Sequence, residues 1–164
     1  METNNQRKTP TVLVPYDFGP KAKTALQEAI KVADFIKGQI YLLSVLQASN
    51  FFTELFKSEK QQREERRHVE NKLKEVILET RKTYHGNIRY IVEHGSPAEV
   101  ILEQAQIRNA QYIIMGKMSS TVSAFHFIGP LTMHIIASAP CPVITVSENS
   151  IENGRFDNIV LPID

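Results

Sequence analysis

The side chains that most often carry catalytic or metal chemistry are scattered in this sequence. No two of the five histidines share a spacing typical of metal ligands, and they are His68, His85, His94, His126 and His134. The single cysteine, Cys141, lies between two prolines, and we interpret it as a small buried apolar residue rather than a nucleophile. The sequence holds no Gly-x4-Gly-Lys-Ser/Thr phosphate loop, no Gly-x-Gly-x2-Gly motif and no Gly-x-Ser-x-Gly elbow. We therefore expect no metal site and recognise no catalytic constellation.

The elements that position any site follow from the apolar pattern. Five short apolar runs are predicted strands, at residues 11–16, 40–45, 88–92, 111–115 and 143–146. Four segments with apolar residues three and four apart are predicted helices, at residues 22–36, 57–83, 97–105 and 129–138. Because strands and helices alternate, the pattern predicts an open five-stranded parallel α/β sheet with helices on both faces.

Local signals mark the ends of two helices. Gly38 is expected to take the left-handed conformation that ends the first helix. Ser96 is expected to cap the helix that starts at Pro97, with Glu99 completing a capping box. Four large apolar residues before the long helix are either its start, packed on the sheet, or a subunit contact or pocket lid; they are Phe51, Phe52, Leu55 and Phe56.

Bulk composition limits the class of protein. The 164 residues suit one α/β domain, and 42% apolar with 23% charged residues is ordinary globular composition. A formal net charge of +1 gives no electrostatic reason to expect a nucleic-acid or membrane partner. One cysteine excludes an internal disulfide, which fits a reducing compartment. With a polar tail at residues 1–10 and no long apolar run, we expect a cytoplasmic protein.

The end of the sequence repeats its beginning. Residues 158–164 follow the same design as residues 11–17: Pro15 and Asp17 recur as Pro162 and Asp164, and the apolar positions match in kind. The repeat comes about one domain length later, which is typical of tandem domains. We expect a domain over residues 11–147, followed at 148–164 by a linker and the first strand of a second, truncated repeat. The alternative is a chance match.

Four segments, in the same order along the chain, resemble the universal stress protein family. They are residues 12–18, residues 42–45, residues 93–97, and a stretch from 114–116 through Gly129 to 139–143. The resemblance covers residues 10–147 and implies a Rossmann-like sheet of the adenine nucleotide alpha hydrolase type, with strand order 3-2-1-4-5. Ligands in such sheets bind beyond the carboxyl ends of the strands, where the order reverses. Asp17 and Gly116 both belong to that place.

Nucleotide-binding members of this family carry Gly-x2-Gly-x9-Gly followed by Ser or Thr. This sequence keeps the spacing, with Gly116, Ser119 in place of the second glycine, Gly129, and Pro130 in place of the hydroxyl residue. Pro130 removes both a hydroxyl and a backbone N–H. Because charge-assisted hydrogen bonds contribute about 1.5–3 kcal/mol each, losing two weakens binding by about a hundredfold or more unless another group compensates. Lys117 can compensate as a point charge.

The resemblance implies an adenine-nucleotide site for ATP or AMP with Mg, or none where the two replacements disable it. Asp17 would contact ribose or adenine, and its alternative role is a turn residue that caps the first helix. Val45 would line the base pocket, and Pro15 is more readily explained by the shape of the strand end. The full candidate set is Pro15, Tyr16, Asp17, Val45, Met115, Gly116, Lys117, Ser119, Gly129, Pro130 and Leu131.

These observations leave several functions open. The first is a stress-response regulatory module with a degenerate adenine-nucleotide site. The alternative is a dimerisation or scaffold domain that binds no nucleotide, which a crevice filled by Tyr16, Met118 or Phe127 would favour. Slow nucleotide hydrolysis is the enzymatic alternative and requires phosphate release that Asp17→Ala abolishes. The fifth strand is expected to be an exposed edge that pairs in a homodimer, or with the second half of a tandem protein.

Overall fold

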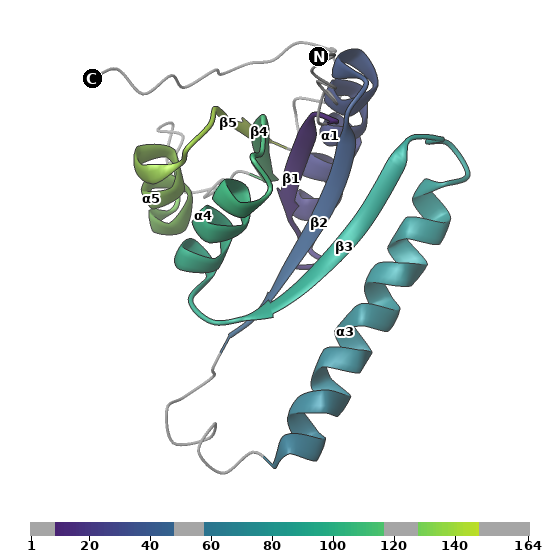
Figure 1. The fold of residues 1–164 in the computed structure, drawn as a ribbon, viewed down its shortest axis with the longest axis vertical. Helices are drawn as coiled ribbons and strands as arrows, with labels where there is room; N and C mark the ends of the chain where they lie inside the picture. Colours follow the sequence, from purple (N-terminus) through teal and green to yellow (C-terminus); the bar gives the residue numbers. More distant parts are fainter. Residues whose placement is uncertain (1–8, 48–57, 117–127, 148–164) are drawn as a thin grey trace, which may run out of the picture.

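Strands and helices alternate along the whole described part of the protein (Figure 1). The structure, a computed structural model, describes residues 9–47, 58–116 and 128–147. The elements in chain order are β1 (Thr11–Pro15), α1 (Pro20–Ile36), β2 (Gln39–Leu46), α3 (Glu59–Thr80), β3 (Asn87–His94), α4 (Pro97–Ile107), β4 (Tyr112–Gly116), α5 (Pro130–Ser138) and β5 (Val143–Val146). The apolar cluster at residues 51–56, the candidates Lys117, Met118, Ser119 and Phe127, and the repeat at 158–164 lie outside the described residues.

The five strands form one sheet in the order β3-β2-β1-β4-β5, and every neighbouring pair is parallel. This confirms the predicted fold class and strand order. In the centre of the sheet Leu13 of β1 lies beside Tyr41 of β2 on one side and Ile113 of β4 on the other. The chain moves outward from β1 through β2 to β3 and then returns to the other side at β4. The order therefore reverses between β1 and β4, at the carboxyl ends of these two strands.

Two hydrophobic cores hold the sheet between its helices. Successive strand residues point to opposite faces, so Val12 and Val14 pack toward α1 and α3 while Leu13 packs toward α4 and α5. All three side chains are fully buried. Burying one such side chain contributes about 1.5–3 kcal/mol, so a strand buried on both faces fixes its register firmly. In Figure 1, α4 and α5 lie together on one side of the sheet and α3 on the other.

The helix ends differ in detail from the predictions. Lys37, not Gly38, takes the left-handed conformation after α1, with φ 54°. Gly38 is needed for close packing instead, because a Cβ there would lie 2.7 Å from the carbonyl oxygen of Pro10. Ser96 stands at the N-cap of α4, but its side chain makes no capping hydrogen bond. A capping box forms at α3, where Ser58 and Gln61 exchange hydrogen bonds of 3.3 and 2.9 Å.

Candidate functional site

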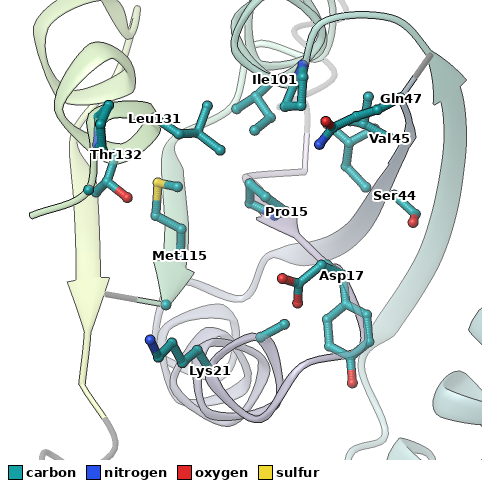
Figure 2. Close-up of a pocket in the computed structure, with 17 residues that line it drawn as sticks. Pro15, Asp17, Lys21, Ser44, Val45, Gln47, Ile101, Met115, Leu131 and Thr132 are labelled. Carbon is teal, nitrogen blue, oxygen red and sulfur yellow. The ribbon is translucent and has the colours of Figure 1, made fainter. Parts of the chain in front are cut away.

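A cavity of about 290 Å³ opens at the point where the strand order reverses. The carboxyl ends of β1, β2 and β4 and the first turns of α1, α4 and α5 enclose it. Figure 2 shows Val45 and Gln47 on one side, Leu131 and Thr132 on the opposite side, and Pro15 and Met115 between them. Nine predicted site residues line the cavity, namely Pro15, Tyr16, Asp17, Val45, Met115, Gly116, Gly129, Pro130 and Leu131. The other two, Lys117 and Ser119, are not described.

Asp17 both shapes the turn before α1 and faces the cavity. Its Oδ1 accepts a hydrogen bond of 2.9 Å from the backbone N–H of Gly19, the N-cap residue of α1. The next residue, Phe18, has a φ of 68°, which is rare for an aromatic residue, and its ring meets that of Tyr16 edge-on with the ring centroids 5.5 Å apart. The turn therefore fixes the carboxylate, which points toward the cavity in Figure 2. Oδ2 has no partner among the described residues and can accept from a ligand.

The ring of Tyr16 does not fill the crevice. Its side chain is 3% exposed and belongs to the core under α1, where it packs against Phe18. Burial, and to a smaller extent the neighbouring Asp17 carboxylate, raises the pKa of the Tyr16 hydroxyl. A crevice filled by Tyr16, Met118 or Phe127 would have favoured the alternative that binds no nucleotide, and Tyr16, the one of the three that the structure describes, leaves it open.

The N-terminal turn of α5 presents hydrogen-bond donors to the cavity. Gly129 is its N-cap residue and Pro130 its first residue, with no side-chain cap. The first N–H that bonds within this turn is that of Met133, which donates to Gly129 O at 2.9 Å. The N–H groups of Leu131 and Thr132 therefore have no partner within the helix. Such a helix end attracts anions through its free N–H groups and its dipole.

Gly116 has a structural role that the sequence did not show. A Cβ at this position would lie 2.6 Å from both the Cβ and the carbonyl oxygen of Lys21, so the end of β4 packs directly on the first turn of α1. The glycine thus brings α1 close to the sheet, whatever it does for a ligand. The same residue is therefore the first glycine of the motif and the point at which β4 contacts α1.

We expect Gly116→Ala to destabilise the fold by about 1–3 kcal/mol, because α1 or β4 must move to admit a methyl group against backbone atoms. Urea unfolding followed by circular dichroism measures the change. An unchanged unfolding midpoint would show that β4 and α1 separate without cost.

Polar residues that the sequence analysis missed complete the site. Lys21 and Thr132 line the cavity near Gly116 and Leu131, while Ser44 and Gln47 line it at the end of β2. Thr132 is 5% exposed, and its hydroxyl makes no hydrogen bond with a described residue. One signal in the sequence indicates the neighbourhood of these residues but not the direction of their side chains: each stands within a few residues of the carboxyl end of a central strand or at the start of the helix after the glycine motif.

Cys141 lies outside this site and packs against the α4 and α5 side of the sheet. It is half-buried rather than fully buried, which corrects the expectation in degree. Burial raises the pKa of the thiol, and a backbone hydrogen bond from Ile113 opposes that shift. The neutral thiol, a weak nucleophile, is therefore the favoured form.

The rate of Cys141 alkylation by iodoacetamide should rise with pH at a higher midpoint in the folded protein than in urea. The raised pKa withholds the thiolate until more alkaline conditions. Comparing midpoints, not plateau rates, separates this effect from simple steric protection. Equal midpoints in the two states would contradict it.

Within the described ranges, no group of three or more histidine, cysteine, aspartate or glutamate side chains lies close enough to hold a metal ion. None of the described helices combines the length and the apolar character needed to cross a bilayer.

A parallel sheet whose strand order reverses, with a cavity at the switch point, defines an open α/β protein of the Rossmann-like kind. The sequence matches the universal stress protein family over residues 8–147, and the chain belongs to that family. It is 24% identical over 156 residues to a universal stress protein of Methanocaldococcus jannaschii, with 88% of this chain and 86% of that protein covered.

Solved structures share the fold. Universal stress protein UspA from Lactobacillus plantarum superposes with a TM-score of 0.69 at 22% identity, over 85% of this chain and 98% of that chain. The universal stress protein from Archaeoglobus fulgidus in complex with dAMP gives a TM-score of 0.60 at 18% identity, over 84% of this chain and 96% of that chain.

Proposed function

We propose that this protein is a regulatory universal stress protein domain that binds an adenine nucleotide in the cavity between β1 and β4. The observation that carries the proposal is the open cavity at the switch point, with a helix N-terminus at one end and a free carboxylate oxygen at its edge. Its volume of about 290 Å³ lies just below the range of about 300–1,000 Å³ that is usual for small-molecule sites. That size suits a mononucleotide.

The two ends of the cavity differ in chemistry. Val45, Pro97 and Ile101 give one end an apolar lining, with Gln47 as a polar group that can read a base edge. Asp17 stands between the ends and can accept from ribose hydroxyls through Oδ2. The complex of the Archaeoglobus fulgidus protein with dAMP supports an adenine nucleotide as the ligand class.

The end of the cavity at α5, where the phosphate would lie, keeps several groups that can bind an anion. Pro130 supplies neither an N–H nor a hydroxyl, but the N–H groups of Leu131 and Thr132, the Thr132 hydroxyl and the Lys21 ammonium remain. A phosphate group placed there meets a positive charge, a hydroxyl and the positive end of a helix dipole. We infer that these groups compensate in part for Pro130.

Calorimetric titration with AMP and with Mg-ATP, on protein freed of co-purified nucleotide, tests the proposal. We expect saturable binding that Asp17→Asn weakens, because the substitution removes the charge on the acceptor while keeping its shape. Gln27→Glu, an exposed change on α1 outside the cavity, is the control. Absence of binding at millimolar nucleotide would disprove it and leave assembly as the function.

Assembly is the second candidate, and exposed apolar residues beside the β5 edge favour it. Leu131 and Met133 of α5 are 40% and 52% exposed, and Ile144 of β5 is only partly buried. We propose that this edge pairs with a second copy of the chain or with the second half of a tandem protein. Sedimentation at micromolar concentration measures the state directly, and a stable monomer would rule out the homodimer.

A further inference from the structure

The opposite edge of the sheet, formed by β3, carries a basic groove that is separate from the proposed nucleotide cavity. β3 is the last strand of the sheet on its side and is eight residues long, twice the length of β5. Its outer edge pairs with no described strand, so backbone N–H and C=O groups face outward along it. Figure 1 shows α3 running beside this edge.

A groove of about 490 Å³ lies between α3 and the β3 edge. Ile77 and Leu78 contribute apolar surface from α3, and Leu78 is 64% exposed. Lys74 and Arg81 stand one turn before and one turn after this pair on the same face of the helix. No acidic residue lines the groove.

The other face of the β3 edge is basic as well. The guanidinium of Arg89, on β3, donates to the Tyr41 hydroxyl at 3.4 Å. The guanidinium of Arg108, at the end of α4, lies 4.5 Å from the centre of the Tyr41 ring. Both arginines thus contact Tyr41, and Arg89 also donates to the side chain of Asn87. All of these partners are neutral.

None of these four cations, Lys74, Arg81, Arg89 and Arg108, forms an ion pair within the described residues. Two other arginines of α3 are paired: Arg63 with Glu59 at 3.3 Å and Arg66 with Glu70 at 3.1 Å. The positive charge of these four side chains at the β3 edge is therefore not neutralised by a described carboxylate. A positive, unpaired strand edge repels a second copy of itself, which disfavours edge-to-edge dimerisation.

We propose that the β3 edge binds an extended acidic peptide of a partner protein, which adds as a sixth strand. Side chains of an added strand alternate between the two faces. Those that face α3 meet the exposed Leu78, so they are apolar, and those on the other face meet Arg89, so they are acidic. The partner segment therefore alternates acidic and apolar residues, with further acidic groups able to reach Lys74 and Arg81.

Fluorescence anisotropy with a labelled peptide of four Glu-Val repeats tests this proposal on the full chain. We expect saturable binding that Arg81→Glu and Arg89→Glu each weaken by about tenfold, because each reverses a charge on one face of the β3 edge. Arg63→Glu, the same change on the solvated part of α3, should leave affinity within about twofold. Arg81→Gln and Arg89→Gln serve where a reversal disturbs folding, which thermal unfolding followed by circular dichroism reports.

Two further measurements separate strand addition from simple charge attraction. Hydrogen exchange of the β3 amides should slow in the complex, and a Glu-Val peptide N-methylated at every residue should not bind, because strand pairing needs backbone N–H groups. Equal binding of the methylated peptide would overturn the proposal. So would a loss of affinity in Arg63→Glu as large as the losses in Arg81→Glu and Arg89→Glu. So would absence of binding, or a change of oligomeric state in the Arg89→Glu protein, which would make a second copy the occupant.

Discussion

Replacing Pro130 with serine is expected to tighten nucleotide binding by about tenfold to a hundredfold. Serine restores two donors at once, a backbone N–H at the first position of α5 and a hydroxyl beside the cavity. Both would reach the end of the cavity where Leu131 and Thr132 already present free N–H groups. Calorimetric titration of AMP and Mg-ATP into both proteins measures the gain.

Pro130→Ala divides that effect into its two parts. Alanine restores the N–H alone, so its affinity should fall between those of the wild type and Pro130→Ser. Loss of proline at the first helical position lowers helix stability somewhat. Because both variants lose the same proline, their melting temperatures should fall by similar amounts. If the alanine and serine variants bind no better than the wild type, then the first turn of α5 does not contact phosphate and the proposed position of the nucleotide is wrong.

The strands and the sheet order were predictable from the sequence because the central strands are buried on both faces. Runs such as residues 11–15 and 112–115 are almost continuously apolar, which is typical of a parallel sheet between helix layers. The order of strands was not contained in the apolar pattern. It came from the resemblance to the universal stress protein family, and the pairing of β1 with both β2 and β4 confirms it.

The site was predictable in its backbone framework and less so in its side chains. Asp17 and Gly116 follow strands that the pattern located well, so their meeting at the switch point could be expected. Lys21 and Thr132 belong to helices, and their direction depends on how each helix lies on the sheet. Local sequence does not specify that placement, which is why the groups that we propose to compensate for Pro130 were found only in the structure.

Single residues with two roles were the hardest to interpret. Gly116 was assigned to phosphate by its motif, although its missing side chain is also required by the contact with Lys21. Asp17 was left between a turn role and a ligand role, and one oxygen serves the turn while the other remains available. In both cases the sequence position was informative, but only distances in the folded chain could show the second role.

Lys21→Glu is expected to weaken nucleotide binding by about a hundredfold while leaving the fold at least as stable as before. The ammonium is the one cationic group among the described residues that line the cavity, so its reversal replaces attraction to phosphate with repulsion. The Cβ that packs on Gly116 is kept, so the contact between α1 and β4 is preserved. Lys23→Glu, an exposed change of equal charge two residues along α1, should bind normally.

The stability of the same variant provides an independent check. Lys21 stands in the first turn of α1, where a cation opposes the helix dipole and where no acidic residue is present. A glutamate there interacts favourably with that dipole by about 0.3–1 kcal/mol. We therefore expect a slightly higher melting temperature together with the loss of binding. If the melting temperature falls, the loss of nucleotide affinity is explained by misfolding. If stability rises and binding is unchanged, Lys21 does not lie at the phosphate end of the cavity.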